Sequence, residues 1–112
     1  MASKSTTEGK TVTPEDSDIY LFMSPVSEET CRDLIAFIIG KNLENPKAKY
    51  LQILINSGGG DLNSAFAVID IIRGSPIPIR TIGLGTIASA AFAIFIAGEK
   101  GHRTLTPNTS IL

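Results

Sequence analysis

Apolar residues along this chain follow two alternating spacings, which predict strands separated by helices. A continuous apolar run at 19–22 precedes a segment with the three- and four-residue spacing of an amphipathic helix, at Cys31, Leu34, Ile35 and Ile38. The expected strands are 19–22, 50–55, 77–84 and 103–105, with another beginning at 111, and the expected helices begin near 27, 61 and 88. Strands alternating with helices are typical of an α/β layer fold with a mostly parallel sheet.

The three expected helices differ in their ends and in their apolar faces. Ser27 can cap the first helix, with two glutamates in the first turn where the dipole favours anions, and Asn45-Pro46 ends it at the latest. The third helix, 88–97, is apolar on all sides, which predicts that it is buried. The second helix begins at Asp61 and carries one apolar face, formed by Leu62, Ala65, Phe66, Ile69 and Ile72.

Composition limits the class of protein. The 112 residues suffice for one small domain, and a net charge of -1 argues against a nucleic-acid partner bound through a basic surface. A single cysteine, Cys31, excludes an internal disulfide and a Cys-based zinc site, and a single histidine, His102, leaves almost no room for a His-rich metal site. We expect no metal and no cofactor. The polar segment 1–17 is expected to be a mobile tail without a secretory signal, so we expect one domain over 18–112 in a cytoplasmic protein.

The uncharged run 81–98 is long enough to cross a membrane. Gly83, Gly85 and Ser89 interrupt it, however, and favour a buried strand, a turn and a buried helix instead of a membrane span. A small domain cannot easily cover two such elements by itself, because the buried fraction falls with size. We therefore expect either more chain or packing between subunits.

Two glycine-bearing turns are candidates for chemistry. In the first, Asn56-Ser57-Gly58-Gly59-Gly60, three glycines allow the N–H groups to point into one cavity ahead of a helix. The turn can therefore hold an anion or an oxyanion, or it can be a flexible connection only. It is not a Walker loop, because no Gly-Lys-Ser/Thr follows.

The second turn, 83–89, allows three interpretations. Gly83, Gly85 and Ala88 fit the glycine pattern of a dinucleotide site, but residues 103–110 lack the acidic residue that such a site needs. Ser89 can be a nucleophile at the start of a helix, or it can simply cap that helix. If the two strands are parallel neighbours, both turns lie at one edge of the sheet, where open α/β sheets bind ligands.

The two turns together resemble the caseinolytic protease proteolytic subunit, the ClpP family of serine peptidases. The matching stretches are 55–60 and 85–89, with shorter matches at 97–98, 100–101, 103 and 107–108. The resemblance runs from Ile19 to Leu112 and implies a ClpP/crotonase-like fold of layered strand and helix repeats. It also implies that residues 18–112 are the N-terminal part of such a domain, with the C-terminal part missing.

Carried over residue by residue, the resemblance implies that Ser89 is the catalytic nucleophile. The oxyanion hole then consists of two backbone N–H groups, those of Gly60 and Ala90. The family usually has proline where Gly58 stands and Met-Gly where Ala90-Ala91 stand. A donor of the oxyanion hole is a main-chain group, so alanine at position 90 is compatible with the function.

A serine nucleophile also needs a general base. His102 follows Ser89 by thirteen positions, across a helix of about 15 Å, and is expected to be a surface turn residue. In the family the histidine of the triad falls two positions beyond Leu112, and the aspartate lies further on. We therefore expect the 112 residues alone to be inactive for lack of a base.

The resemblance implies a partner set as well. Family members form heptameric rings that stack into double rings and cleave unfolded polypeptide delivered by an AAA+ ATPase; no membrane or nucleic acid takes part. Two alternatives stay open: a non-catalytic ring subunit, and a crotonase-fold enzyme that stabilises the enolate of an acyl-CoA with similar N–H groups.

Overall fold

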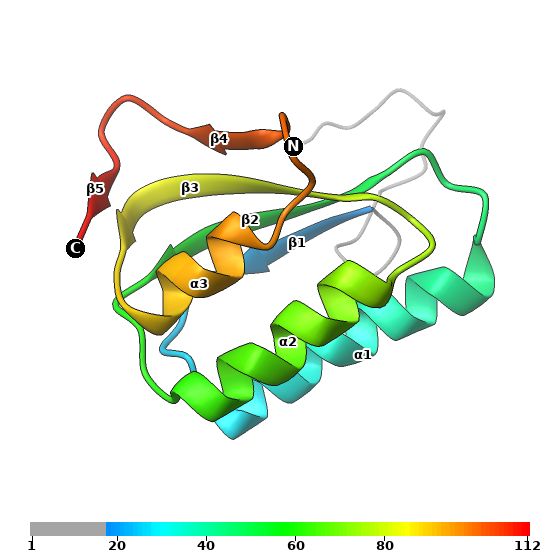
Figure 1. The fold of residues 1–112 in the computed structure, drawn as a ribbon, viewed down its shortest axis with the longest axis horizontal. Helices are drawn as coiled ribbons and strands as arrows, with labels where there is room; N and C mark the ends of the chain where they lie inside the picture. Colours follow the sequence, from blue (N-terminus) through cyan, green and yellow to red (C-terminus); the bar gives the residue numbers. More distant parts are fainter. Residues whose placement is uncertain (1–17) are drawn as a thin grey trace, which may run out of the picture.

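The computed structural model describes residues 18–112, so the polar segment 1–17 and the mobile tail expected there lie outside the described residues. Strands and helices alternate along the chain (Figure 1). Their bounds are β1 (Ile19–Phe22), α1 (Glu28–Glu44), β2 (Leu51–Ser57), α2 (Leu62–Gly74), β3 (Ile79–Ile87), α3 (Ala90–Ile96), β4 (Arg103–Leu105) and β5 (Ser110–Ile111). The expected α/β fold is therefore confirmed.

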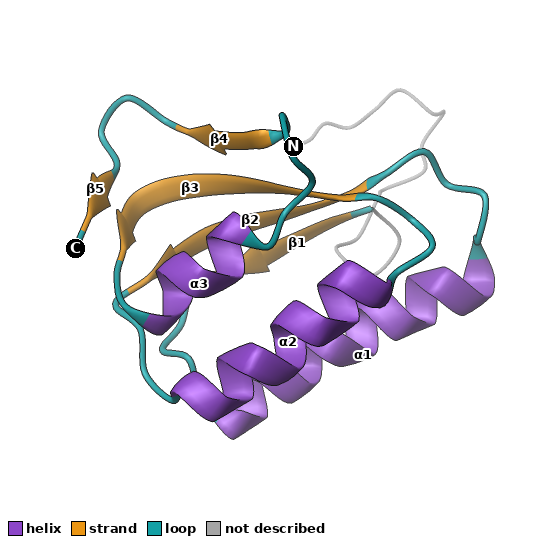
Figure 2. Cartoon of the chain, in the orientation of Figure 1, coloured by secondary structure: helices purple, strands orange, loops and turns teal. Residues whose placement is uncertain are grey.

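One parallel sheet contains all the named strands. Its order is β1-β2-β3-β4. The short strand β5 pairs with the last two residues of β3, further along β3 than the residues that pair with β4. Figure 2 shows α1 and α2 side by side along the sheet, with α3 close to β3. The burial of the β2 side chains alternates along the strand, because successive side chains point to opposite faces of the sheet. Leu51, Ile53 and Ile55 are fully buried, and the residues between them are half-buried.

The starts of the first two helices are as the sequence predicts. Ser27 caps α1 by accepting a hydrogen bond from the N–H of Thr30, whose hydroxyl in turn accepts from the Ser27 N–H. The helix passes Gly40 and ends at Glu44, directly before Asn45. Asp61 caps α2 by accepting a hydrogen bond from the N–H of Ser64. These local signals fix where each helix begins relative to the preceding turn.

The expected apolar face of α2 is wrong in part. Leu62 and Phe66 are 48% and 51% exposed, whereas Val68 is fully buried together with Ala65. Apolar residues surround most of α2, so their spacing does not decide which side faces inward. Packing of α2 against both α1 and α3 makes that choice.

The third helix is shorter and more exposed than expected. It begins at Ala90 and not at 88, and Ile96 is 40% exposed. The expected turn at 83–89 is strand as far as Ile87, because β3 continues through Gly85. Within residues 18–112, no helix is long and apolar enough to span a bilayer.

The single cysteine, Cys31, and the single histidine, His102, lie where the sequence indicates. Cys31 is buried in the core, and burial raises the pKa of its thiol, partly offset by hydrogen bonds from Thr30 and Ser27. His102 is exposed in the connection between α3 and β4. Neither residue is placed as a reactive group.

Candidate active site at the ends of β2 and β3

Ser89 stands at the sharp turn between β3 and α3. Its backbone has φ 55° and ψ −122°, and it is the only non-glycine residue with a positive φ in the described part of the chain. Such a conformation costs on the order of 1–3 kcal/mol and persists only where the surroundings impose it. The side chain is exposed and makes no capping hydrogen bond, so Ser89 does not act as a side-chain cap.

The first glycine turn lies directly against Ser89. Gly59 has φ +98°, and a methyl group there would lie 2.7 Å from the Ala88 oxygen and 2.9 Å from the Ser89 Cβ. It would also lie 3.4 Å from the Ala90 nitrogen. Only glycine allows both this φ and this approach. The prediction that both turns meet at one edge of the sheet is thus confirmed.

Gly60 is held from one side by the segment before α1. The Val26 N–H donates to the Gly59 oxygen over 2.9 Å, and the Val26 oxygen accepts from the Asp61 N–H over 2.8 Å. Val26 therefore bonds to the residues on both sides of Gly60 in a parallel bridge. In such a bridge the N–H of the residue between them points away from the bridging strand.

Two backbone N–H groups at this edge of the sheet, those of Gly60 and Ala90, lack a hydrogen-bond acceptor within residues 18–112. Ala90 is the first residue of α3, and the first N–H groups of a helix have no partner within it. Among residues 18–112, the N–H groups of Gly60 and Ala90 donate no hydrogen bond to protein atoms. The arrangement therefore offers two N–H donors, on adjoining turns, beside an exposed hydroxyl.

Ser57 joins the two turns and was missed by the sequence analysis. Its hydroxyl accepts a hydrogen bond from the Gly59 N–H, and its carbonyl oxygen accepts one from the Ala88 N–H, both over 3.1 Å. The side chain is buried. A serine directly before a glycine run was the only sequence signal, because the second bond depends on the neighbouring strand.

His102 lies at the opposite end of β3 from Ser89. The Thr81 N–H donates to the His102 oxygen, which places the histidine beside the beginning of β3. Six residue steps along the strand lead from Thr81 to Ile87, at most about 20 Å at ~3.3 Å per residue. His102 does not reach the Ser89 hydroxyl across this length.

The glycines of the dinucleotide pattern serve the sheet instead. Gly83 and Gly85 lie within β3, not in a turn that faces a helix N-terminus. A methyl group on Gly83 would clash with the side chain of Ile87 and lie 2.8 Å from that of Leu105. The dinucleotide interpretation is therefore wrong. In the same described range, no three His, Cys, Asp or Glu side chains gather as metal ligands.

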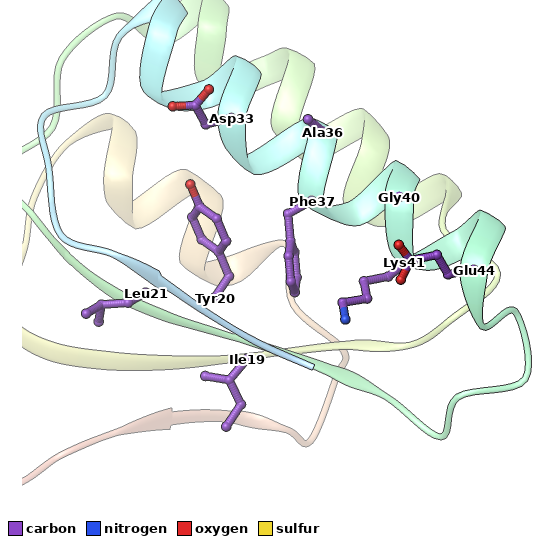
Figure 3. A pocket seen from close by; sticks show the side chains of 9 residues that line it. All are labelled: Ile19, Tyr20, Leu21, Asp33, Ala36, Phe37, Gly40, Lys41 and Glu44. Atoms are coloured by element: carbon purple, nitrogen blue, oxygen red, sulfur yellow. The ribbon is translucent and has the colours of Figure 1, made fainter. Parts of the chain in front are cut away.

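A separate hollow of about 480 Å³ lies between β1 and α1 (Figure 3). The rings of Tyr20 and Phe37 lie 5.1 Å apart there, and the Lys41 nitrogen lies 5.7 Å from the Phe37 ring and 3.7 Å from the Asp18 carboxylate. Burial, with a smaller effect of the Asp33 charge, raises the pKa of Tyr20. None of these side chains comes from the turns around Ser89.

The family comparison matches almost the whole chain. The model of the Clp protease family covers residues 11–112. An ATP-dependent Clp protease proteolytic subunit 2 from Treponema denticola is 44% identical over 64 residues, which cover 57% of this chain and 32% of that protein. The ATP-dependent Clp protease proteolytic subunit of Deinococcus radiodurans is 29% identical over 89 residues, covering 80% of this chain and 43% of that protein.

Solved structures show the same relationship. The ClpP protease catalytic domain from Plasmodium falciparum superposes with a TM-score of 0.78 at 33% identity, covering 84% of this chain and 53% of that one. A ClpP1 mutant from Listeria monocytogenes has a TM-score of 0.78 at 26% identity, covering 87% and 56%. The chain thus spans less than half of the two curated relatives and slightly more than half of the two structures.

Proposed function

Because the chain belongs to the Clp protease family, we propose that residues 18–112 are the N-terminal part of a serine peptidase domain in which Ser89 is the nucleophile. The backbone N–H groups of Gly60 and Ala90 form its oxyanion hole. The family match does not favour the acyl-CoA alternative.

One observation carries this proposal, the close packing of Gly59 against Ser89 and the Ala90 nitrogen. This contact brings the glycine turn and the start of α3 to the same exposed hydroxyl. The strained backbone of Ser89 supports the same conclusion, since a serine held on a sharp strand-to-helix turn presents its oxygen for attack.

The chemistry follows from these groups. The Ser89 oxygen attacks the carbonyl carbon of a peptide bond, its proton passes to a base, and the carbonyl oxygen becomes an oxyanion. Two N–H donors about 3 Å from that oxygen stabilise it, and losing one such donor typically costs on the order of 100- to 1,000-fold in rate. Both donors are supplied by the backbone here.

The base does not come from these residues. His102 is the single histidine of the sequence and lies beside the start of β3. We therefore expect the 112 residues alone to hydrolyse peptides at trace level at most, with the triad histidine and aspartate supplied from outside them. A positioned general base typically contributes about 100- to 10,000-fold.

Assembly and partners follow from the same relationship. Relatives are named as proteolytic subunits of an ATP-dependent protease. We infer that the protein cleaves unfolded polypeptide inside a chamber formed by stacked seven-membered rings, fed by an AAA+ ATPase in the cytoplasm.

A peptide boronic acid tests the site without requiring turnover. Its trigonal boron accepts the Ser89 oxygen and becomes a tetrahedral anion, while the hydroxyl proton passes to water. We expect the 112-residue chain to form this adduct with a dipeptide boronic acid, visible as a tetrahedral boron signal by NMR.

The matched control is Ser89→Ala, which should give no adduct, with Ser110→Ala as an exposed serine outside the site that should leave the adduct intact. An adduct that survives in Ser89→Ala, or no adduct in the unaltered chain, would contradict the assignment. In a parallel assay with a fluorogenic peptide, strong Ser89-dependent turnover would overturn the expected inactivity.

A further inference from the structure

Strand β3 contains a β-bulge close to its end, a few residues before Ser89. Ile55 of β2 pairs with Gly83, but Ser57 pairs with Ile87, so that one residue of β2 faces three residues of β3. A bulge of this kind bends the strand and leaves some of its backbone groups outside the ladder. It determines where Ala88 and Ser89 emerge relative to the first glycine turn.

The one residue of β2 opposite the bulge is Asn56. Its side-chain oxygen accepts a hydrogen bond from the Thr86 N–H over 3.2 Å. A methyl group on Gly85, which has φ +65°, would lie 3.1 Å from both the Nδ2 and Oδ1 atoms of Asn56. The amide thus lies against the bulge and gives the Thr86 N–H the acceptor that the interrupted ladder lacks.

We propose that Asn56 is a positioning residue for the nucleophile: its side-chain amide holds the bulge of residues 84–86 and thereby sets Ser89 against Gly59. This inference rests on the proposed function of Ser89. Ser57, next along β2, bonds to the other side of the same junction through the Ala88 N–H. Two adjacent residues of β2 therefore fix both ends of the segment that leads into Ser89.

Loss of the amide oxygen has a defined consequence. The Thr86 N–H is left half-buried without its acceptor, which is unfavourable for any backbone donor. The bulge then relaxes toward other backbone conformations, and the strained Ser89 turn loses part of what maintains it. Ser89 and the Ala90 N–H move relative to Gly59, whereas the core below β2 stays packed.

The test compares three variants of the 112-residue chain. Asn56→Leu removes the acceptor at similar volume, and Asn56→Asp keeps an oxygen in its place. Gln52→Leu is the matched control, since Gln52 lies on the same strand and face, is also half-buried, and is far from the bulge. If Asn56→Leu does not fold, Asn56→Ala replaces it.

Two readouts separate positioning from general stability. The first is the dissociation constant of the boronate adduct: we expect about tenfold weakening in Asn56→Leu, corresponding to ~1.4 kcal/mol. Asn56→Asp and Gln52→Leu should stay within about threefold of the unaltered chain. The second is the backbone amide spectrum without ligand, in which Asn56→Leu should shift the Ser89 and Ala90 signals and Gln52→Leu should not.

The outcomes distinguish this inference from the proposed function. An adduct on Ser89 that is equally strong in Asn56→Leu, with unshifted Ser89 and Ala90 signals, overturns the positioning role and leaves the function intact. An equal loss in Gln52→Leu also overturns it, since the effect is then one of stability. No adduct in the unaltered chain overturns the proposed function, while shifted Ser89 signals in Asn56→Leu alone still establish the structural part.

Discussion

The carbonyl oxygen of Leu112 accepts a hydrogen bond from the Ser89 N–H over 3.3 Å, and the Leu112 N–H donates to the Ile87 oxygen over 3.0 Å. The end of β5 therefore runs in parallel beside the residues that lead into Ser89. A chain that continues in this direction passes next to Ser89. This relationship is compatible with the proposal that a base follows Leu112, since a residue shortly after it would lie near the Ser89 hydroxyl.

An extension by two residues ending in histidine should increase the reactivity of Ser89. A histidine two positions beyond Leu112 has the register that the family resemblance implies, and a neighbouring imidazole accepts the hydroxyl proton. We expect labelling by a fluorophosphonate to accelerate by about tenfold or more, below the full contribution of a base oriented by a third residue. Mass spectrometry of the labelled protein measures the rate.

The control for this extension ends in alanine and should label at the rate of the unextended chain. Acceleration that persists when Ser89→Ala is combined with the histidine extension would show that another residue is being labelled. No acceleration by histidine would contradict the register.

Alanine substitutions at Gly58 and Gly59, two neighbouring glycines of the first turn, should differ in their effect on stability. Gly59→Ala requires a positive φ and places a methyl group 2.7 Å from the Ala88 oxygen, so we expect a loss of about 2–3 kcal/mol in the free energy of unfolding and no boronate adduct. Gly58→Ala meets no atom within 4 Å and should change stability by less than about 1 kcal/mol. Urea denaturation measures both. Equal effects of the two substitutions would show that Gly59 does not pack as described.

Asp61 should contribute to stability only above acidic pH. Hydrogen bonds from the Ser64 side chain and N–H lower the pKa of its carboxyl below the ordinary 3.8, although the group is fully exposed. A lowered pKa in the folded state means that the stabilisation is complete above about pH 4 to 5 and declines as pH falls through the folded-state value. We therefore expect Asp61→Ala to be destabilising at pH 7 and to become less so as the pH falls through the lowered pKa of Asp61.

Denaturation at several pH values checks this cap. Asp70→Ala is the control, since Asp70 is an exposed carboxylate within the same helix and not at its start. The Asp61 interpretation fails if Asp61→Ala is as destabilising in acid as at pH 7, or if Asp70→Ala shows the same pH dependence.

Local signals in the sequence were sufficient for part of the fold. Ser27 and Asp61 mark helix starts because a cap acts on the N–H two or three residues ahead, and the structure confirms both. The order of strands and helices was predictable for a similar reason, as each element has its own spacing.

What the sequence could not predict depends on neighbouring elements. The inward face of α2 was wrong at Leu62 and Phe66, because apolar residues on several sides leave the rotation of the helix to its packing partners. The bulge in β3 and the bond from Thr86 to Asn56 join residues thirty positions apart, and no local pattern specifies them. The meeting of Gly59 with Ser89 was expected only from the parallel pairing of β2 with β3.

The free N–H groups beside Ser89 belong to main-chain atoms, and their aim is set by torsion angles at Gly59, Gly60 and Ser89. If the proposed oxyanion hole forms here, its donor at position 90 is a main-chain group, so the side chain of that residue is under little direct selection from the bound carbonyl. Homologues in which that residue has drifted can keep an equivalent binding geometry, and a comparison of torsion angles would detect them where a comparison of residue types would not.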